Sequence, residues 1–344
     1  MSRTASAPES LRKGPFIAEA RPPFSDLGSM TMRVVGAEET HRLLDYPGLV
    51  EALRDLFRRG VDKVERVLVS QDLPAGGRND WLLLPAWQYG RHQGVKLVSV
   101  YPGNEARGIA TVQGLYLLFD GTSGLPLLAV DGVALTLRKT AANSALAATY
   151  LARRDASTLL MLGAGAMAPH LIEAHATVRP IRRVLIWNRT AARAEALARS
   201  LDHLPKLSVS VVADIAAAVA EADVISAATM ARAPLIRGSW LKPGQHLDLV
   251  GGYTEEMREA DDEAVLKARI FVDARFTAAA YAGDICQPLA AGLIADGDIT
   301  DSFQLARGER PGRLSEAEIT LFKSGGGGHE DLGTAQYLLG RLSS

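Results

Sequence analysis

The sequence contains almost no cysteine. Cys286 is its one cysteine in 344 residues, so the chain cannot form an internal disulfide, and we expect a reducing compartment, the cytoplasm. A small buried side chain is a better interpretation of Cys286 than a catalytic nucleophile. No apolar run approaches the roughly 20 residues that span a bilayer, so we expect no membrane partner.

The sequence also lacks an excess of charge of either sign and any metal-binding pattern. Its 38 Lys and Arg nearly balance 39 Asp and Glu, for a formal net charge of −1, which argues against a nucleic-acid partner. His, Cys and Asp residues nowhere cluster at the spacing of metal ligands. The remaining composition, 47% hydrophobic and 22% charged, is typical of a soluble globular protein long enough for two domains.

One stretch near the middle of the chain predicts a dinucleotide-binding unit. The apolar run Thr158–Leu162 leads into Gly163-Ala-Gly165-Ala-Met-Ala168, and an alanine-rich helix and the strand Arg183–Trp187 follow. In such a β-α-β unit Gly163 makes the tight turn, and Gly165 lets the backbone approach a pyrophosphate. The N-terminus of the helix then faces the phosphates.

The end of the second strand indicates which dinucleotide binds. NAD sites usually place Asp or Glu there, about 20 residues after the turn, to accept hydrogen bonds from the ribose. This sequence has Asn188, Arg189 and Thr190 instead. A guanidinium and a hydroxyl suit a 2′-phosphate, although Arg189 could also be a solvated residue at a strand end. We therefore favour NADP(H) over NAD(H).

The first half of the chain is predicted to be α+β. Residues 1–29 are rich in Ser, Pro, Arg and Gly without periodicity, and we expect a disordered extension there. A strand at Val34–Val35 and a helix from Glu38 to Phe57 follow. Closely spaced strands with glycine turns then favour a largely antiparallel sheet. We assign this domain to residues 30–145, and we expect a long helix from Thr140 to Ala152 to lead out of it.

Strands and helices alternate in the second half, which ends in three strands at Asp223–Thr229, His246–Gly252 and Ile270–Asp273. This alternation predicts a Rossmann-type, doubly wound parallel sheet in residues 146–317. The last strand of the chain, Ile319–Lys323, has no evident partner in that sheet. We therefore expect residues 318–344 to return to the first domain.

Several motifs in this order resemble the ornithine cyclodeaminase/mu-crystallin family over nearly all of Met32 to Leu339. No single motif is decisive, but their joint order is highly specific. They are Val64-Glu-Arg66-Val, Leu84-Pro85-Ala86, Gly94-Val-Lys96-Leu-Val, Pro102-Gly-Asn104, Phe119-Asp120-Gly-Thr-Ser-Gly124, Leu135-Thr136-Leu-Arg138-Lys139-Thr140, Gly163-Ala-Gly165, Trp187-Asn188-Arg189-Thr190, Ile319-Thr-Leu-Phe322 and Glu330-Asp331.

The resemblance implies a homodimer whose first domain binds substrate and pairs with its mate. Family members use NAD(P) to reduce cyclic or open imino acids, or to cyclise an amino acid with loss of ammonia. By the family pattern Arg66, Lys96 and Lys139 surround the substrate carboxylate beside the nicotinamide, and we expect Lys96 to be catalytic. The cofactor contacts that we expect are Thr140, Gly163, Gly165, Ala166, Met167, Asn188, Arg189, Thr190, Thr229, Val250 and Gly252.

Other interpretations of these residues stay open. Arg66 alternates with apolar residues in a predicted strand and could face solvent. Lys139 could end the strand before the long helix. Lys96, by contrast, lies in an apolar strand where a charge needs a reason, which favours a role in the site. His92 and His329 are more typical of loop histidines than of acids or metal ligands.

Three residues depart from the family pattern. Lys139 stands where the family usually has Arg, and Lys cannot grip a carboxylate at two points. Neighbouring Arg138 should point to the opposite face of the strand. Met167 stands where many members have Gln. Tyr253 follows the strand end Val250-Gly-Gly252, where cyclodeaminases carry Asp.

Three functions are compatible with these residues, and a reductase is favoured. We expect NADPH-dependent reduction of a small α-imino acid, such as a pyrroline- or piperideine-2-carboxylate, or amino-acid dehydrogenation. The second function is an ammonia lyase that cyclises a diamino acid with a recycled cofactor. It needs a base where Tyr253 stands, and a tyrosine with a pKa of about 10 is a poor one, although Glu255 and Glu256 lie close in sequence and could take its place. The third is a non-catalytic protein of mu-crystallin type that uses NADPH to shape a ligand pocket.

Overall fold

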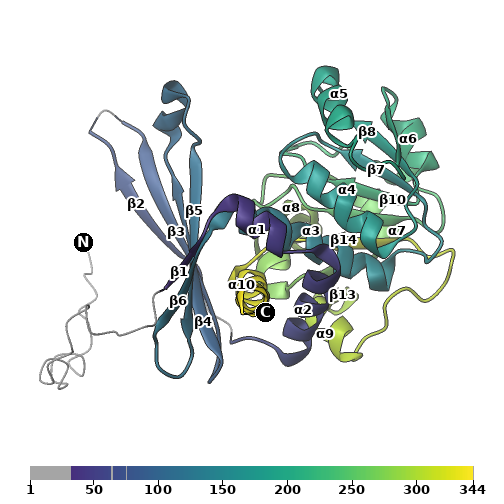
Figure 1. Cartoon of the computed structure of the whole chain (residues 1–344). Helices are drawn as coiled ribbons and strands as arrows, with labels where there is room; N and C mark the ends of the chain where they lie inside the picture. Colours follow the sequence, from purple (N-terminus) through teal and green to yellow (C-terminus); the bar gives the residue numbers. More distant parts are fainter. Residues whose placement is uncertain (1–31, 63–64, 75, 344) are drawn as a thin grey trace, which may run out of the picture.

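The structure, a computed structural model, describes residues 32–62, 65–74 and 76–343. The predicted extension at residues 1–29 lies outside them. The strands form two sheets, which Figure 1 shows side by side. They are β1 (Arg33–Val35), β2 (Val67–Asp72), β3 (Arg78–Gln88), β4 (His92–Val100), β5 (Val112–Asp120), β6 (Pro126–Asp131), β7 (Thr158–Leu162), β8 (Arg183–Trp187), β9 (Ser208–Val211), β10 (Val224–Ala227), β11 (His246–Leu249), β12 (Arg269–Val272), β13 (Ile299–Asp301) and β14 (Thr320–Lys323).

Helices lie between and around the two sheets. They are α1 (Ala37–Leu43), α2 (Tyr46–Arg59), α3 (Gly132–Leu151), α4 (Met167–Val178), α5 (Ala191–Ser200), α6 (Ile215–Glu221), α7 (Asp262–Lys267), α8 (Gly283–Ala290), α9 (Ser302–Arg307) and α10 (Gly328–Leu342), with the short helical turns η3 (Pro102–Arg107), η4 (Gly238–Trp240), η5 (Arg275–Ala279) and η6 (Asp296–Asp298). In the described part of the chain, none of the helices combines the length and the hydrophobicity that crossing a membrane requires.

The first sheet has six strands in the order β1-β6-β5-β4-β3-β2. All its neighbours pair antiparallel except β1 and β6, which are parallel, so the predicted antiparallel character is confirmed. Hairpin turns help to set the register, as where the Asp120 carboxylate accepts a hydrogen bond from the Ser123 N–H at 2.7 Å. In this register Lys96 on β4 lies opposite Leu84 on β3 and Tyr116 on β5.

The second sheet has eight parallel strands in the order β13-β12-β14-β11-β10-β7-β8-β9. Its central strands are mostly apolar and buried on both faces, as in parallel sheets covered by helices. On β7, Leu159 and Met161 join a core with α3 and α4, whereas Leu160 and Leu162 join a second core with α6, α7 and α8. The predicted Rossmann-type sheet beside an α+β half is therefore confirmed.

The place of β14 differs from the prediction. It lies between β11 and β12 in the parallel sheet, so the expectation that Ile319–Lys323 has no partner there is wrong. Leu321 and Phe322 are both fully buried although they point to opposite faces, as expected for a strand of a parallel sheet that is covered by helices on both faces. Of the last segment, the helix α10 does pack against the first sheet, on β3 and β4, and against α2 (Figure 1).

Two helices differ in their limits from the prediction. The helix expected from Glu38 to Phe57 is divided into α1 and α2, because Asp45 caps α2 and accepts a hydrogen bond from the Gly48 N–H at 2.9 Å. The helix expected to begin at Thr140 begins directly after its cap, Asp131. Since α3 is buried nearly all round, it has no polar face whose period would reveal its start.

Lys139 and Arg138 therefore lie on a helix and not at a strand end. Arg138 donates a hydrogen bond to the His41 carbonyl at 2.6 Å and covers the Tyr46 ring, 4.4 Å from its centroid. It points away from Lys139, as expected, but for another reason. Consecutive residues of a helix differ in direction by about 100°, whereas the prediction assumed the alternation of a strand.

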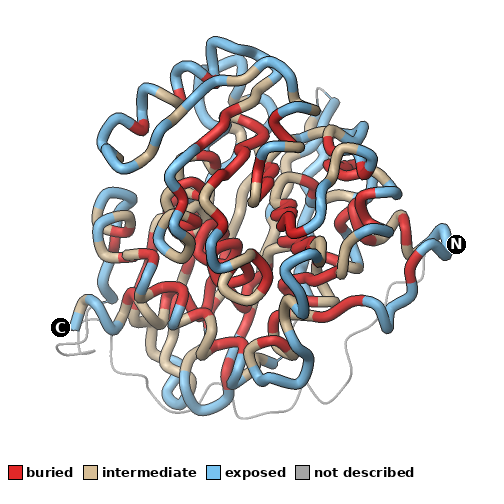
Figure 2. The backbone as a smooth tube through the Cα atoms, turned by 90° about the vertical axis from the view of Figure 1, so that its right-hand side faces the viewer, coloured by how far each residue is buried: buried red, intermediate tan, exposed pale blue. Residues whose placement is uncertain are grey.

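The two halves of the molecule share one apolar core. Helix α3 packs against α2, α4 and α10, and also against β5 and β14, one strand from each sheet. A cluster of buried side chains accordingly runs from Leu53 on α2 through Leu146 on α3 to Leu171 on α4. Figure 2 shows the buried segments, in red, running through the middle of the molecule. The shared core sets how the two halves face each other.

Candidate active site

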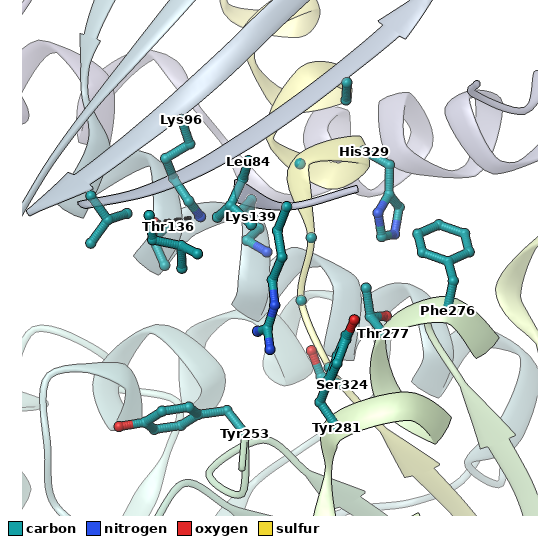
Figure 3. Close-up of a pocket in the computed structure, with 18 of the residues that line it drawn as sticks. Leu84, Lys96, Thr136, Lys139, Tyr253, Phe276, Thr277, Tyr281, Ser324 and His329 are labelled. Carbon is teal, nitrogen blue, oxygen red and sulfur yellow. Dashed lines mark hydrogen bonds between the residues drawn. The ribbon is translucent and has the colours of Figure 1, made fainter. Parts of the chain in front are cut away.

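A cavity of about 730 Å³ lies between the two halves. One wall comes from β3, β4 and α3, and the opposite wall comes from loops at the carboxyl ends of β11, β12 and β14. Figure 3 shows Leu84, Lys96 and Lys139 on the first wall, with Tyr253 and Tyr281 across the cavity. Ligands of doubly wound sheets bind at this edge, which makes the cavity the candidate active site.

Lys96 points from the first sheet into the cavity and is only 6% exposed. Its Nζ forms an ion pair with Asp331 Oδ2 at 2.9 Å and donates to Thr136 Oγ1 at 3.5 Å. Burial lowers the pKa of Lys96 below its usual value, although the carboxylate of Asp331 opposes this shift. The ammonium group of Lys96 is thus paired with the buried carboxylate of Asp331 and is also accessible to a ligand in the cavity.

Lys139 reaches the same cavity from α3. Its Nζ pairs with Glu330 Oε2, and Asn143 Nδ2 donates to Glu330 Oε1 at 2.6 Å. Burial acts to lower the pKa of Lys139, but the carboxylates of Glu330 and Asp331 outweigh burial, so the pKa is raised. Lys139 is therefore a firmly held cation.

Helix α10 supplies both carboxylates of this lysine–carboxylate cluster, which consists of Lys96, Lys139, Glu330 and Asp331. The two acids are fully buried in the first turn of the helix, where the positive end of the helix dipole favours negative charge. In the sequence, Glu330-Asp331 is one of the motifs that resemble the family, without a predicted role. A signal was present, since two adjacent acids follow a glycine run at the start of an apolar helix.

The loop Gly325–Gly328, which leads into α10, is held by Asp273. The Oδ2 of Asp273 accepts hydrogen bonds from the N–H groups of Gly325 and Gly326 at 2.8 and 2.6 Å. Gly326 has a φ of +67°, a conformation that favours glycine. Burial, with the neighbouring Glu330 carboxylate, raises the pKa of Asp273 to about 7. The loop thereby brings the first turn of α10 to the cavity.

Arg66 lies at the opening of the cavity. It is on the segment before β2 and not inside a strand as predicted, because β2 begins at Val67. Its guanidinium lies over the ring of Tyr281, 3.9 Å from the centroid, and both side chains line the cavity. The three cations expected around a carboxylate, Arg66, Lys96 and Lys139, therefore line one cavity, one of them exposed and two of them buried.

The glycine turn after β7 has room for a dinucleotide. Gly163 has a φ of +102°, and a Cβ there would lie 2.6 Å from the Ala228 carbonyl oxygen, so glycine is required. A Cβ on Gly165 would meet nothing within 4 Å, which leaves space for a phosphate. Ala166 and Met167 follow at the start of α4, whose N–H groups favour an anion. These residues fit a bound pyrophosphate.

Asn188 orders the same turn. Its Oδ1 accepts a hydrogen bond from the Ala164 N–H at 3.2 Å, and its Nδ2 donates to the Thr190 carbonyl at 2.9 Å. This structural role comes in addition to the predicted cofactor contact. Arg189 and Thr190 are exposed just beyond β8, at the position where a ribose is expected.

The other predicted cofactor residues lie at strand ends on the same edge of the sheet. Thr229 follows β10, and Val250 and Gly252 follow β11. Thr140 on α3 and Val250 line the cavity, as does Tyr253, which is 56% exposed. The structure thus brings these residues to the edge where the glycine turn lies, and their contacts with a cofactor stay a prediction.

The two histidines considered in the sequence have different surroundings. His329 lies in the first turn of α10 and lines the cavity, packed against the rings of Phe57 and Phe276, and burial lowers its pKa. His92, at the start of β4, is not among the described residues that line the cavity. In the described ranges, no three His, Cys, Asp or Glu side chains are grouped as metal ligands.

A doubly wound sheet and a glycine turn with room for a pyrophosphate at its carboxyl edge are the features of a dinucleotide-binding protein. The sequence model of the ornithine cyclodeaminase/mu-crystallin family matches residues 30–344, and the chain belongs to this family. The resemblance seen in the motifs is confirmed.

Relatives with described activities resemble the chain over most of its length. A Δ(1)-pyrroline-2-carboxylate reductase of Paracoccus denitrificans is 42% identical over 288 residues, 80% of this chain and 91% of that one. The structure of the Thermococcus litoralis Δ(1)-pyrroline-2-carboxylate reductase with NADH and L-proline has a TM-score of 0.81 at 28% identity, covering 91% of this chain and 98% of that one. An archaeal alanine dehydrogenase dimer with bound NAD has a TM-score of 0.80 at 27% identity, covering 91% and 96%.

Proposed function

We propose that this chain is an NAD(P)H-dependent reductase that converts a small α-imino acid with one carboxylate, of the Δ1-pyrroline-2-carboxylate type, into the amino acid. The observation that carries the proposal is the cavity at the carboxyl edge of the parallel sheet, into which Lys96 and Lys139 point (Figure 3). The relatives named as pyrroline-2-carboxylate reductases support this substrate class. A bound NAD(P)H supplies the hydride that adds to the imine carbon.

The charges of the cavity suit a single carboxylate. In the lysine–carboxylate cluster two positive charges balance two negative ones. Arg66 adds one positive charge at the opening, where it stacks on Tyr281. The acids at the rim, Asp62 and Glu65, are exposed and are screened by water and salt. Lys96 and Lys139 can both donate to one substrate carboxylate beside their own partners, whereas a second carboxylate meets no further buried lysine or arginine among the described lining residues.

The cavity residues act on the substrate by placing it. Lys96 and Lys139 donate hydrogen bonds to the substrate carboxylate, and Arg66 reaches it from the opening. A carboxylate held in this way fixes the imine carbon at the cofactor end of the cavity, which converts binding energy into proximity. The imine reacts in its protonated form, so the addition of hydride at carbon leaves a neutral amine and no further proton has to move in that step.

For the cofactor we propose NADP(H) in preference to NAD(H). Arg189 and Thr190 are exposed at the end of β8, where a guanidinium and a hydroxyl can meet a 2′-phosphate. Asn188 stands where an NAD site usually carries a carboxylate, and it is engaged in the glycine turn. The solved relatives contain NADH or NAD, so the proposal depends on these three residues.

We also propose a homodimer formed through the first sheet. Apolar side chains on one face of its strands β2, β3 and β5 are 39–56% exposed, namely Val67, Val69, Trp81 and Leu115. Apolar side chains gathered on a surface are typical of a protein interface. The archaeal alanine dehydrogenase of the same fold is described as a dimer. Light scattering should give the mass of two chains, and a monomer at micromolar concentration would contradict the proposal.

An assay panel tests the activity. We expect the absorbance of reduced nicotinamide to fall with Δ1-pyrroline-2-carboxylate or Δ1-piperideine-2-carboxylate, and faster with NADPH than with NADH. Pyruvate with ammonia tests whether an open-chain imine is reduced. A dicarboxylic imine tests whether the cavity accepts a second carboxylate. If none of these substrates oxidises either cofactor, the chain is not an imino-acid reductase.

Ammonia release separates the reductase from a cyclising lyase. Tyr253 lines the cavity where a lyase needs a base, and a tyrosine is a weak base near neutral pH. We therefore expect no ammonia from ornithine with catalytic amounts of NAD⁺. Conversion of ornithine to proline and ammonia by the unaltered protein would favour the lyase. A protein that binds NADPH and a ligand but turns over neither would be a binding protein.

A further inference from the structure

One fully buried carboxylate, that of Glu259, joins the ends of two neighbouring strands of the parallel sheet. Its Oε1 accepts hydrogen bonds from the N–H and the Oγ1 of Thr229, both at 2.8 Å. Its Oε2 accepts a hydrogen bond from the Gly251 N–H at 2.8 Å. Thr229 lies just after β10 and Gly251 just after β11. Three donors from two loops therefore converge on a single side chain.

These two loops are where the nicotinamide end of a cofactor belongs. In doubly wound sheets the ligand lies against the loops at the carboxyl ends of the strands. Val250 and Tyr253, on either side of Gly251, line the cavity that also holds Lys96. A small movement of the loops after β10 and β11 therefore changes the wall against which cofactor and substrate are placed.

Charges from two further elements surround Glu259. Lys323 Nζ, at the end of β14, lies 3.9 Å from Glu259 Oε2 and 3.3 Å from Asp284 Oδ2 on α8, and all three side chains are fully buried. Asp284 Oδ1 accepts hydrogen bonds from the N–H groups of Glu259 and Ala260 at 2.8 and 3.1 Å. Among the described residues Lys323 Nζ has no hydrogen-bond acceptor. Two carboxylates thus share one ammonium, away from water.

Gly252 lies directly on this group. A Cβ at Gly252 would be 2.9 Å from Asp284 Oδ2 and 3.5 Å from Lys323 Nζ. The buried charges are therefore in contact with the backbone that forms the cavity wall, and not in a remote part of the core. Burying three charges is costly unless they are held in place by partners. Here Lys323 is held by the two carboxylates, Asp284 by the N–H groups of Glu259 and Ala260, and Glu259 by the two loops.

We propose that Glu259 is a positioning residue, which in its ionised form fixes the two loops that hold the nicotinamide end of the cofactor. The inference rests on the proposed function, because it assigns the loops to NAD(P)H. A carboxylate accepts all three hydrogen bonds at once. In a carboxylic acid the oxygen that carries the proton becomes a donor and a poorer acceptor, so the hydrogen bonds from either Thr229 or Gly251 are weakened. One proton on Glu259 therefore loosens one loop.

The electrostatics agree with this geometry. Burial raises the pKa of Glu259 to about 7, Lys323 acts against this shift, and Asp284 adds to it. The folded protein thus binds a proton at Glu259 below about pH 7, and this proton must leave when the loops close on the cofactor. Cofactor affinity should therefore fall as the pH falls through 7, by about 10-fold between about pH 8 and pH 6.

The test uses NADH as the probe, because it lacks the titratable 2′-phosphate. Binding is measured by fluorescence titration without substrate, from about pH 6 to pH 8, on the full chain and on Glu259→Gln. The amide has one acceptor oxygen in place of two, so we expect binding at least about 10-fold weaker at pH 8, the loss for one unmade buried hydrogen bond. We also expect the pH dependence to disappear. Glu263→Gln, an exposed change on α7, is the matched control. It should leave the NADH affinity and its pH dependence unchanged.

If NADH binds, two outcomes overturn the proposal. One is an affinity of the unaltered protein for NADH that does not change with pH, and the other is a Glu259→Gln protein that binds NADH with the same affinity and pH dependence. If Glu259→Gln does not fold, Thr229→Val removes one of the three donors, and it should weaken NADH binding while the pH dependence remains. Failure of the chain to reduce any imino acid would remove the proposed function but leave this result standing. Failure to bind either cofactor would overturn both.

Discussion

The two ends of the candidate site hold their charges in different ways. At the substrate end, the lysine–carboxylate cluster is buried, and Lys96 and Lys139 are paired with Asp331 and Glu330. At the ribose end, Arg189 is exposed on the surface beyond β8. Unpairing a buried charge costs several kcal/mol, whereas an exposed charge contributes little to folding. The substrate end is thus part of the stability of the fold, and the ribose end can change almost independently of it.

The largest effect is expected for Lys96→Met. The change leaves Asp331 buried without its cation, which should lower the free energy of unfolding by about 3–5 kcal/mol, and NAD(P)H oxidation with an imino acid should be nearly lost. Urea unfolding and the turnover assay measure the two effects.

A second substitution separates these two losses. Asp331→Asn added to Lys96→Met removes the isolated charge, so we expect much of the stability to return without the activity. If Lys96→Met alone is as stable as the unaltered protein, the two ends do not differ in the way described. If the double variant recovers activity, Lys96 does not bind the substrate.

A smaller effect, confined to one cofactor, is expected for Arg189→Ala. Loss of a charge-assisted contact to a phosphate costs about 1.5–3 kcal/mol, which corresponds to NADPH binding that is about 10- to 150-fold weaker. NADH binding and the melting temperature should change little, since Arg189 is exposed. Arg193→Ala, an exposed arginine on α5, serves as the control. Equal losses for NADPH and NADH would show that Arg189 does not recognise the 2′-phosphate.

The smallest effect is expected at Tyr281, which belongs to the second half but contacts Arg66 of the first. Tyr281→Leu removes the ring under the guanidinium, and an exposed cation–π contact contributes about 0.5–1 kcal/mol. The KM for the imino acid should therefore rise about 2- to 5-fold with kcat nearly unchanged. Tyr281→Phe keeps the ring and should behave like the unaltered protein. A rise in KM for Tyr281→Phe would indicate that the hydroxyl, and not the ring, is important.

Local patterns in the sequence were sufficient for the class of the fold. Gly163 and Gly165 between two apolar runs predict the dinucleotide unit, because the tight turn and the close approach of a phosphate each require glycine. The position of β14 could not be predicted in the same way. A buried run of four residues shows that a strand is covered on both faces, but it does not show which gap in the sheet the strand fills.

The lysine–carboxylate cluster was predicted only in part. Lys96 was identified because a charge in an apolar strand is unusual. The carboxylates that pair with the lysines were not identified, since Glu330 and Asp331 meet the lysines only through the tertiary fold. Lys139 and Glu330 are separated by 191 positions in the sequence. The predicted first residue of helix α3 was wrong for a related reason. A helix that is buried on all sides has no periodic pattern from which its first residue can be read.

The position of β14 also affects which parts of the sheet can pair while the chain is being made. β14 emerges from the ribosome after every other described strand of its sheet, yet it separates β11 from β12. During synthesis β11 therefore has an unpaired edge. The strands β12 and β13 cannot join the rest of the sheet through β14 until residues 320–323 have been made. Exposed strand edges of this kind favour aggregation. On a ribosome stalled shortly before β14, the pair β12 and β13 would be separate from the five strands β11, β10, β7, β8 and β9. Such nascent chains should depend on chaperones far more than the finished protein does.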